Sequence, residues 1–158
     1  MKIYFDTSIV CYFDQPERGE QFIDTHKLWE KVKAGAFDVY LSEVTTAEVN
    51  DCEELKKSKL FEYLDQIEYT LIETDERTTA IAQRFIDLGI LKPKNFEDYQ
   101  HIAAAIISEC DVIVSWNFKN IVNHKTIMGV KAITALEGFD DILIYTPSVL
   151  AGGDDNDI

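Results

Sequence analysis

KIYFDTS, at residues 2–8, joins a short run of strand-forming residues to the start of a helix. Residues 2–5 include Ile, Tyr and Phe, which favour strands, and the run stops at Asp6. Residues 7–14 then fit one or two turns of helix, which a hydroxyl side chain at their start could cap. The stretch therefore predicts a strand that ends in a carboxylate and leads directly into a helix.

Short apolar runs and helical segments alternate along the rest of the chain. Further strands are expected at residues 38–41, 69–72, 112–115 and 142–145. Apolar residues recur at helical spacing over residues 20–33, 43–49, 53–64, 75–88, 96–109 and 124–136. Strands that alternate with helices in this way favour a parallel sheet with helices on both faces. We therefore expect an α/β fold, a three-layer α/β/α sandwich with a five-stranded parallel sheet.

Length and composition indicate one folded domain. The chain has 158 residues, of which 46% are hydrophobic and 28% are charged, as in ordinary globular proteins. We expect a single domain over residues 1–150 and an acidic, disordered tail over residues 151–158, where three Asp residues follow two glycines. No apolar run has the length of a membrane span or of a signal-peptide core, so we expect a cytoplasmic protein.

Acidic residues outnumber basic ones by 29 to 15, which gives a formal net charge of −14. Broad, unspecific binding of nucleic acid depends on Lys and Arg side chains that neutralise phosphates. The sequence therefore argues against that class of protein, and any contact with nucleic acid has to be made by few residues. Lys119 and Lys125 follow the strand at 112–115 and are the better candidates for contact with phosphate, since the denser basic cluster at 56–59 more simply forms a solvated helix face.

Acidic and amide side chains fall where the expected strands end. Asp6 follows the first strand directly, and Asn117 lies two residues beyond the fourth. Glu48 lies in the helix after the second strand, and Asp98 lies in the first turn of the helix that precedes the fourth. The carboxyl ends of parallel strands share one edge of a sheet, so these side chains could meet there. Oxygen ligands of this kind suit a hard divalent cation such as Mg²⁺ or Mn²⁺.

Each of these residues also fits a purely structural role when it is considered alone. Asp6 could cap the helix that follows it, and Asp98 could interact favourably with the dipole of its helix. Glu48 could be a solvated acid on a helix surface, whereas Asn117 and Asn120 could serve the turn after the strand. The order of these residues and their positions at strand ends, taken together, favour a shared site.

Other chemistries fit the sequence less well. The histidines share no metal-ligand spacing, and His101, one helical turn after Asp98, is interpreted as a packing or surface residue. A haloacid-dehalogenase phosphatase needs Asp-x-Asp after its first strand, where this chain has Asp6-Thr7-Ser8. A response-regulator receiver needs an Asp after its third strand, where Ile72-Glu73-Thr74 stands. The sequence also contains no glycine-rich loop that could hold a phosphate.

In these features the sequence resembles the PIN-domain family. The resemblance rests on short motifs in the family's order and extends from Met1 to about Leu150. The motifs are Tyr4-Phe5-Asp6-Thr7-Ser8, Leu41-Ser42 to Ala47-Glu48-Val49, Asp98 to His101-Ile102-Ala103-Ala104-Ala105, Val112-Ile113-Val114-Ser115-Trp116-Asn117-Phe118 and Tyr145-Thr146-Pro147. Within the family, the chain is most similar to the single-domain bacterial toxins of the VapBC type.

The resemblance implies a Mg²⁺- or Mn²⁺-dependent endoribonuclease that hydrolyses RNA phosphodiester bonds. The family's catalytic and metal-binding acids fall on Asp6, Glu48 and Asp98. Its fourth acidic position falls on Asn117, which departs from the usual Asp and lowers the negative charge of the site. Ser8 and Asn117 would then orient the metal-binding acids through hydrogen bonds.

The resemblance also implies partners, namely an RNA substrate and a small antitoxin protein that holds the toxin in check. We further expect a homodimer, because Tyr12, Phe13 and Trp29 in the early helices would otherwise be exposed aromatics. The alternative is a protein-interaction module that has the PIN fold but has lost catalysis. Asn117 and the net charge of −14 favour that alternative.

Overall fold

A computed structural model describes residues 1–152 of the chain. The sheet consists of five parallel strands, β1 (Lys2–Phe5), β2 (Asp38–Ser42), β3 (Tyr69–Ile72), β4 (Val112–Val114) and β5 (Leu143–Tyr145). They lie in the order β3-β2-β1-β4-β5, so β1 is central and pairs with both β2 and β4. The strand order reverses between β1 and β4, and α/β folds bind ligands at the carboxyl ends of such a pair. The five-stranded parallel sheet expected from the sequence is confirmed.

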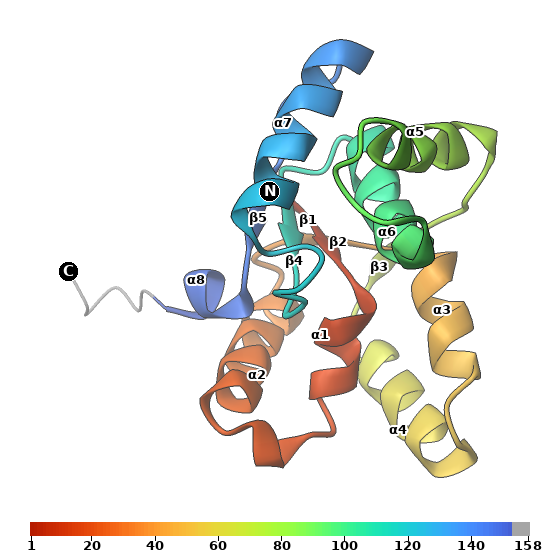
Figure 1. Cartoon of the computed structure of the whole chain (residues 1–158). Coiled ribbons are helices and arrows are strands. Elements are labelled where there is room, and N and C mark those ends of the chain that lie inside the picture. The colour runs from red at the N-terminus through yellow and green to blue at the C-terminus, as the bar shows by residue number, and fades with distance from the viewer. Residues whose placement is uncertain (153–158) are drawn as a thin grey trace.

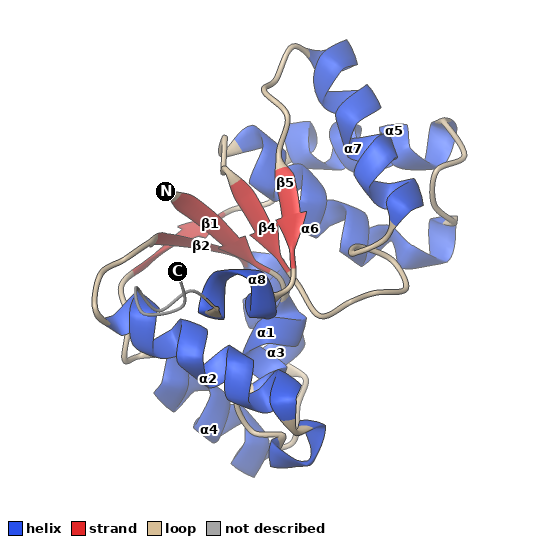
Figure 2. Ribbon diagram, turned by 90° about the vertical axis from the view of Figure 1, so that its left-hand side faces the viewer, coloured by secondary structure: helices blue, strands red, loops and turns tan. Residues whose placement is uncertain are grey.

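Helices cover both faces of this sheet, as Figure 1 and Figure 2 show from two directions. They are α1 (Thr7–Tyr12), α2 (Glu20–Lys33), α3 (Glu43–Asn50), α4 (Glu54–Leu64), α5 (Glu76–Asp87), α6 (Phe96–Ile107), α7 (His124–Glu137) and α8 (Pro147–Ala151), with 3₁₀ turns at Pro16–Arg18 and Pro93–Asn95. One layer holds α1, α2, α4 and α8, the other holds α5, α6 and α7, and α3 contacts both α1 and α6. Within residues 1–152, no helix combines the length and the apolarity that a membrane crossing requires.

Strand β1 shows why the central strand is apolar on both sides. Ile3 and Phe5 point into the core beneath α1, α2 and α4, whereas Tyr4 points into the core beneath α5, α6 and α7. All three side chains are fully buried. Successive side chains of a strand lie on opposite faces, so a sheet that is covered on both faces needs apolar residues at every position of its centre.

Helix α6 ends earlier than the sequence indicates. Helical spacing predicts a helix over residues 96–109, whereas α6 ends at Ile107 with Ser108 as its C-cap. Glu109 then adopts a positive φ of 56°, in the left-handed region that commonly follows a helix end. Gly is the usual residue at such a position, and because Glu stands there instead, the sequence did not mark the end of the helix.

The C-terminal boundary of the domain also differs from the expectation. Residue 151 was expected to begin the tail, but Ala151 is the last residue of α8 and is buried. The Lys31 ammonium donates to the carbonyl oxygen of Leu150 (3.0 Å) and fastens this helix to α2. The domain therefore extends at least to Ala151, and the expectation of a disordered tail over residues 153–158 lies outside the described residues.

The aromatic side chains on which the expectation of a homodimer rested are not freely exposed. Phe13 and Trp29 are 1% and 2% exposed, and their ring centroids lie 4.2 Å apart in the core. Tyr12 stacks on Trp116 and is only partly exposed. The stated reason for a homodimer is therefore wrong for Phe13 and Trp29, whose helical spacing marks a core-facing side, and the homodimer itself stays a prediction.

Candidate active site

Asp6 lies at the carboxyl end of β1, in the centre of the sheet, and is 3% exposed. The residue is the N-cap of α1, but its carboxylate accepts no backbone N–H of that helix. The Ser8 hydroxyl donates to Oδ1 (2.6 Å) and the Ser115 hydroxyl donates to Oδ2 (2.6 Å). The capping role suggested as an alternative is therefore not what holds this side chain, and two serines orient it.

The same two serines connect Asp6 to the loop that follows β4. Ser8 Oγ accepts the backbone N–H of Trp116 (2.9 Å), and Ser115 Oγ accepts the backbone N–H of Asn117 (2.9 Å). Each hydroxyl thus accepts one bond from the loop and donates one to the carboxylate. The sequence suggested Ser8 for such a role, whereas Ser115 was missed because it read as the last residue of a strand.

Asp98, in the first turn of α6, is held by two amide side chains of the same loop. Asn117 Nδ2 donates to its Oδ1 (3.2 Å) and Asn120 Nδ2 donates to its Oδ2 (2.8 Å). The Asn117 oxygen accepts the backbone N–H of Asn120 (3.0 Å), which fixes the amide with its NH₂ group toward Asp98. At the fourth position, the chain therefore presents a neutral donor to Asp98 where the common pattern presents a second acid.

Glu48 comes to the site from α3 and contacts His101 rather than another acid. Its Oε1 lies 3.4 Å from His101 Nε2, and its side chain is 35% exposed. Because a carboxylate only accepts hydrogen bonds, Nε2 carries the proton in this contact. Glu48 is therefore partly open to solvent, whereas Asp6 is enclosed.

His101 is a second residue of this site that the sequence did not identify. Its side chain is 2% exposed, with Nδ1 2.6 Å from the Tyr4 hydroxyl and Nε2 3.2 Å from the Thr7 hydroxyl. The Tyr4 hydroxyl also lies within hydrogen-bond distance of the Ser42 hydroxyl (2.8 Å). The signal in the sequence was the spacing of one helical turn from Asp98, which puts both side chains on one face of α6.

Burial shapes the electrostatics of the two enclosed acids. It raises the pKa of Asp6 above its usual value, an effect that His101 and the two serine hydroxyls oppose. Burial also raises the pKa of Asp98, and Asn120, His101 and Asn117 act in the opposite direction. The negative charge of Asp98 further raises the pKa of Asp6, and the negative charge of Glu48 further raises the pKa of Asp98. Such a cluster of acids attracts a cation that would relieve the repulsion.

The donor set suits a hydrated, hard cation rather than a closed metal cage. Among residues 1–152, no three acidic, histidine or cysteine side chains are gathered tightly enough to enclose an ion by themselves. Mg²⁺ usually keeps several waters and takes only one or two protein carboxylates directly. Mg²⁺ or Mn²⁺ on the oxygens of Asp6, Asp98 and Glu48 therefore stays a prediction, and such an ion would be held partly through water.

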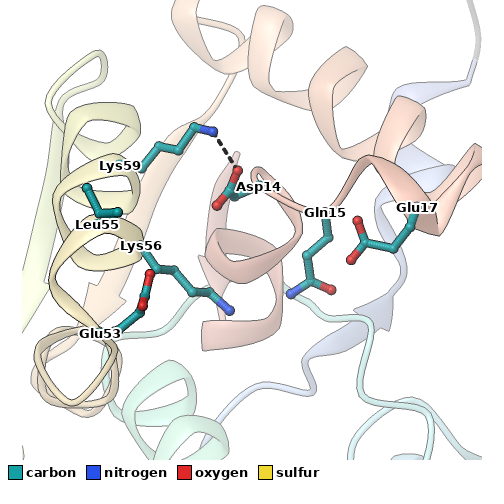
Figure 3. A pocket seen from close by; sticks show the side chains of 7 residues that line it. All are labelled: Asp14, Gln15, Glu17, Glu53, Leu55, Lys56 and Lys59. Atoms are coloured by element: carbon teal, nitrogen blue, oxygen red, sulfur yellow. Dashed lines mark ion pairs between the residues drawn. The ribbon is translucent and has the colours of Figure 1, made fainter.

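Of two hollows in the described part of the chain, one is lined by a candidate acid and the other is not. A groove of about 320 Å³ includes Glu48 and is otherwise lined mainly by polar and acidic side chains, among them Glu43, Asp51 and Glu97. A second hollow, of about 530 Å³ and shown in Figure 3, lies between the end of α1 and α4 and contains none of the three candidate acids.

The basic residues considered in the sequence differ in their freedom to bind phosphate. Lys59 is paired with Asp14 (2.8 Å), as the dashed line in Figure 3 shows. Lys119, on the loop after β4, and Lys125, in the first turn of α7, are exposed. Within the described residues, neither pairs with a carboxylate. No direct contact joins these two lysines to the candidate acids.

Comparison with known proteins finds a relationship of fold. No protein-family model matches the chain, and no curated protein matches it. Among solved structures, the chain is similar to a chain of VapBC2 from Rickettsia felis bound to a DNA fragment from their promoter. The TM-score is 0.57 at 15% sequence identity, and the match covers 92% of this chain and 98% of that chain. The PIN-like fold expected from the sequence is thereby confirmed at the level of fold.

Proposed function

We propose that the chain is a Mg²⁺- or Mn²⁺-dependent endoribonuclease of the toxin type. The observation that carries this proposal is the linkage of three acids from separate elements at the β1/β4 switch point. Asp6 connects through Ser115 and the Asn117 backbone to Asp98, and Glu48 joins the same site through His101. Nothing in the packing of the core requires acids there, and the buried Asp6 costs stability when it is ionised.

Asp6, Asp98 and Glu48 would hold the cation, which supplies Lewis-acid stabilisation of charge on the phosphoryl oxygens and lowers the pKa of a water. The serines hold the Asp6 carboxylate in one orientation, and the amides of Asn117 and Asn120 do the same for Asp98. Preorganised acids of this kind need no rearrangement when substrate arrives.

Glu48 is suited to proton transfer because its side chain is partly open to solvent, whereas Asp6 is enclosed. One of its oxygens contacts His101, and the side chain remains 35% exposed. A carboxylate in that position can accept a proton from an attacking water. His101 acts through Glu48 and is therefore a positioning residue in this proposal.

Partners belong to the same proposal. The structural neighbour is a VapBC2 structure with promoter DNA, which supports a small antitoxin as the protein partner here. For the RNA substrate, Lys119 and Lys125 are the residues proposed to contact phosphate, because they are exposed and unpaired with acids within the described residues.

A PIN-fold interaction module without catalysis is the second candidate function. The observation that favours it is the neutral Asn117 at the fourth position, together with the net charge of −14. Against it stands the hydrogen-bonded orientation of Asp6 and Asp98. A module that only binds protein has no need for Asp6 and Asp98 to be held by two serine hydroxyls and two asparagine amides, so we rank it second.

RNA cleavage separates the two candidates. Purified protein is incubated with RNA and Mn²⁺, in parallel with Asp6→Asn and with Asp65→Asn, which removes the same charge from an exposed position at the end of α4. We expect cleavage by the wild type and Asp65→Asn, none by Asp6→Asn, and none by any of them in EDTA. Cleavage that survives in Asp6→Asn would indicate a contaminating nuclease. RNA left intact by the wild type would favour the interaction module.

A further inference from the structure

Four side chains next to the candidate active site form a continuous column. The Arg18 guanidinium lies 4.9 Å from the centroid of the Tyr12 ring. Tyr12 is stacked on Trp116, with centroids 5.6 Å apart and planes inclined by 12°. Trp116 is followed by Phe118 at 6.3 Å, with planes inclined by 53°. Arg18 and Trp116 both contact Tyr12, Trp116 is buried, and Phe118 is the most exposed of the three aromatic rings of the column.

Phe118 is unusual among the aromatic residues of the chain. All nine Phe, seven Tyr and two Trp residues lie in the described part of the chain. Of these, Phe118 alone is exposed, with 51% of its surface open to solvent. No packing requirement explains an aromatic ring at this position, because its neighbour Trp116 is already buried against Tyr12 and Thr25.

The open ring is fixed close to the candidate acids. Phe118 directly follows Asn117, whose amide donates to Asp98. Its other near neighbour, Trp116, is held by Ser8, which also orients Asp6. The exposed Lys119 follows Phe118 in the chain. The loop after β4 therefore carries an exposed ring, Phe118, and a cation, Lys119, and hydrogen bonds connect the same loop to Asp6 and Asp98.

We propose that Phe118 is a stacking platform for an unpaired RNA base next to the phosphate that is cleaved. Bases stack on aromatic side chains without regard to sequence, and a base can do so only when it is not stacked in a duplex. Lys119 supplies a cation for the adjoining backbone phosphate. The subsite rests on the proposed function, and it assigns to Phe118 the contact with the base beside the phosphate that is cleaved.

The column also answers the objection that the net charge raises. A protein with a formal charge of −14 gains little affinity from general attraction to phosphates. Stacking is a contact that needs no positive charge, and it is worth roughly 5- to 100-fold in affinity for each base. A single lysine and one ring can therefore hold a nucleotide on an otherwise acidic surface.

A protein partner is the other occupant that an exposed ring could have. An apolar protein interface usually needs a contiguous patch of several large side chains. The exposed large hydrophobic residues on the last helices, such as Met128, Leu136 and Val149, come from α7 and α8 rather than from the loop that holds Phe118. A single ring beside a cation fits a base better than it fits an apolar protein surface.

The test compares RNA that has bases with RNA that has none. The probes are a fluorescein-labelled, mixed-sequence single-stranded RNA of 12 nucleotides and an abasic oligonucleotide with the same number of phosphates. Binding is measured by fluorescence anisotropy on the full chain carrying Asp6→Asn, which leaves the RNA uncut, and on the wild type in EDTA. Phe118→Ala and Phe118→Tyr are introduced into both, with Leu136→Ala as a matched removal of an exposed apolar side chain.

We expect Phe118→Ala to weaken binding of the base-containing RNA by roughly 5- to 100-fold, and to leave binding of the abasic probe unchanged. Phe118→Tyr and Leu136→Ala should bind both probes as their parents do. Equal affinities of Phe118→Ala and its parent for the base-containing RNA would overturn the proposal, as would no RNA binding by either parent. A protein that binds RNA through Phe118 but does not cleave it keeps the subsite and loses the proposed nuclease function.

Discussion

Asn117 makes the metal-free site less negatively charged than an acid at the same position would. Its amide lies 3.2 Å from one oxygen of Asp98 and donates to it, while its own oxygen is bonded to the Asn120 backbone. An Asp at this position would place a second carboxylate against Asp98, whose pKa is already raised by burial. The amide therefore favours the metal-free fold at the expense of attraction for a cation.

Asn117→Asp should reverse that balance. We expect the metal-free variant to be less stable than the wild type by on the order of 1–3 kcal/mol, through the lost hydrogen bond to a charged group and the added repulsion. Mn²⁺ should bind the variant more tightly, since one more negative charge faces it. Thermal melting without metal and calorimetric titration with Mn²⁺ measure the two effects. Equal Mn²⁺ affinities would mean that the side chain does not face the cation.

His101→Gln tests whether the buried imidazole positions Glu48. Loss of an outer partner of a metal-binding or catalytic group typically costs 10- to 100-fold in activity, so we expect kcat to fall by roughly that factor with KM for RNA little changed. His124→Gln, an exposed histidine at the start of α7, is the matched control and should keep wild-type rates. A rise in KM with an unchanged kcat would instead assign His101 to substrate binding.

At the scale of single residues, the sequence predicted the acids but not the groups that orient them. Asp6, Glu48 and Asp98 stand out because a carboxylate after an apolar strand or in a first helical turn is visible in a linear pattern. Ser115 and His101 are not visible in this way, since their partners are 109 and 53 residues away in the chain. Ser115 reaches Asp6 only because β1 pairs with β4, and His101 reaches Glu48 only because α3 packs near α6.

The elements around the site are connected by one side chain from the first turn of α3. Glu43 accepts the backbone N–H of Thr74 (2.6 Å) and also the Thr74 hydroxyl. This contact ties the start of α3, which carries Glu48, to the segment between β3 and α5. Hydrogen bonds from the Thr74 hydroxyl and then its N–H lower the pKa of Glu43. The contact therefore depends on the ionised carboxylate.

Glu43→Gln should lower stability near neutral pH and have no effect in acid. A lowered pKa in the folded state adds stability above the unfolded value, about 4.3, and that stability is lost as the pH falls through the folded pKa. We expect a loss of about 0.5–1.5 kcal/mol at pH 7. Melting temperatures of both proteins from pH 7 to pH 3 should converge at the acid end.

Glu97→Gln provides the comparison for this effect. Glu97 is also in the first turn of a helix, α6, so its replacement removes the same favourable interaction with a helix dipole. It forms no side-chain hydrogen bond like that of Glu43 among the described residues. A pH-dependent loss as large in Glu97→Gln as in Glu43→Gln would assign the effect to the dipole and not to Thr74.

For the molecule as a whole, the layers could be predicted from the sequence and the strand order could not. Alternating short apolar runs and helical segments imply a covered parallel sheet. They do not say which strands are neighbours, and the contacts among the candidate site residues depend on the position of β1 between β2 and β4. The short helix α8 was also missed, because Pro147 read as the end of a strand when it in fact begins a helix.

The charge of the whole molecule gives a further way to detect the proposed cation. Self-repulsion in a chain with a net charge of −14 should be screened by any salt, so NaCl should raise the melting temperature. Mg²⁺ at the same ionic strength should raise it further if the acids bind the ion specifically. At a tenfold excess over Kd the additional stability is about 1.4 kcal/mol, or roughly 3–6 °C for a domain of this size.

Asp98→Asn should lose this extra shift, whereas Asp51→Asn, which replaces an exposed acid beside the neighbouring groove, should retain it. Equal responses of the wild type and Asp98→Asn to Mg²⁺ would show that the ion acts only by screening, and the cation would then have to be removed from the proposed function.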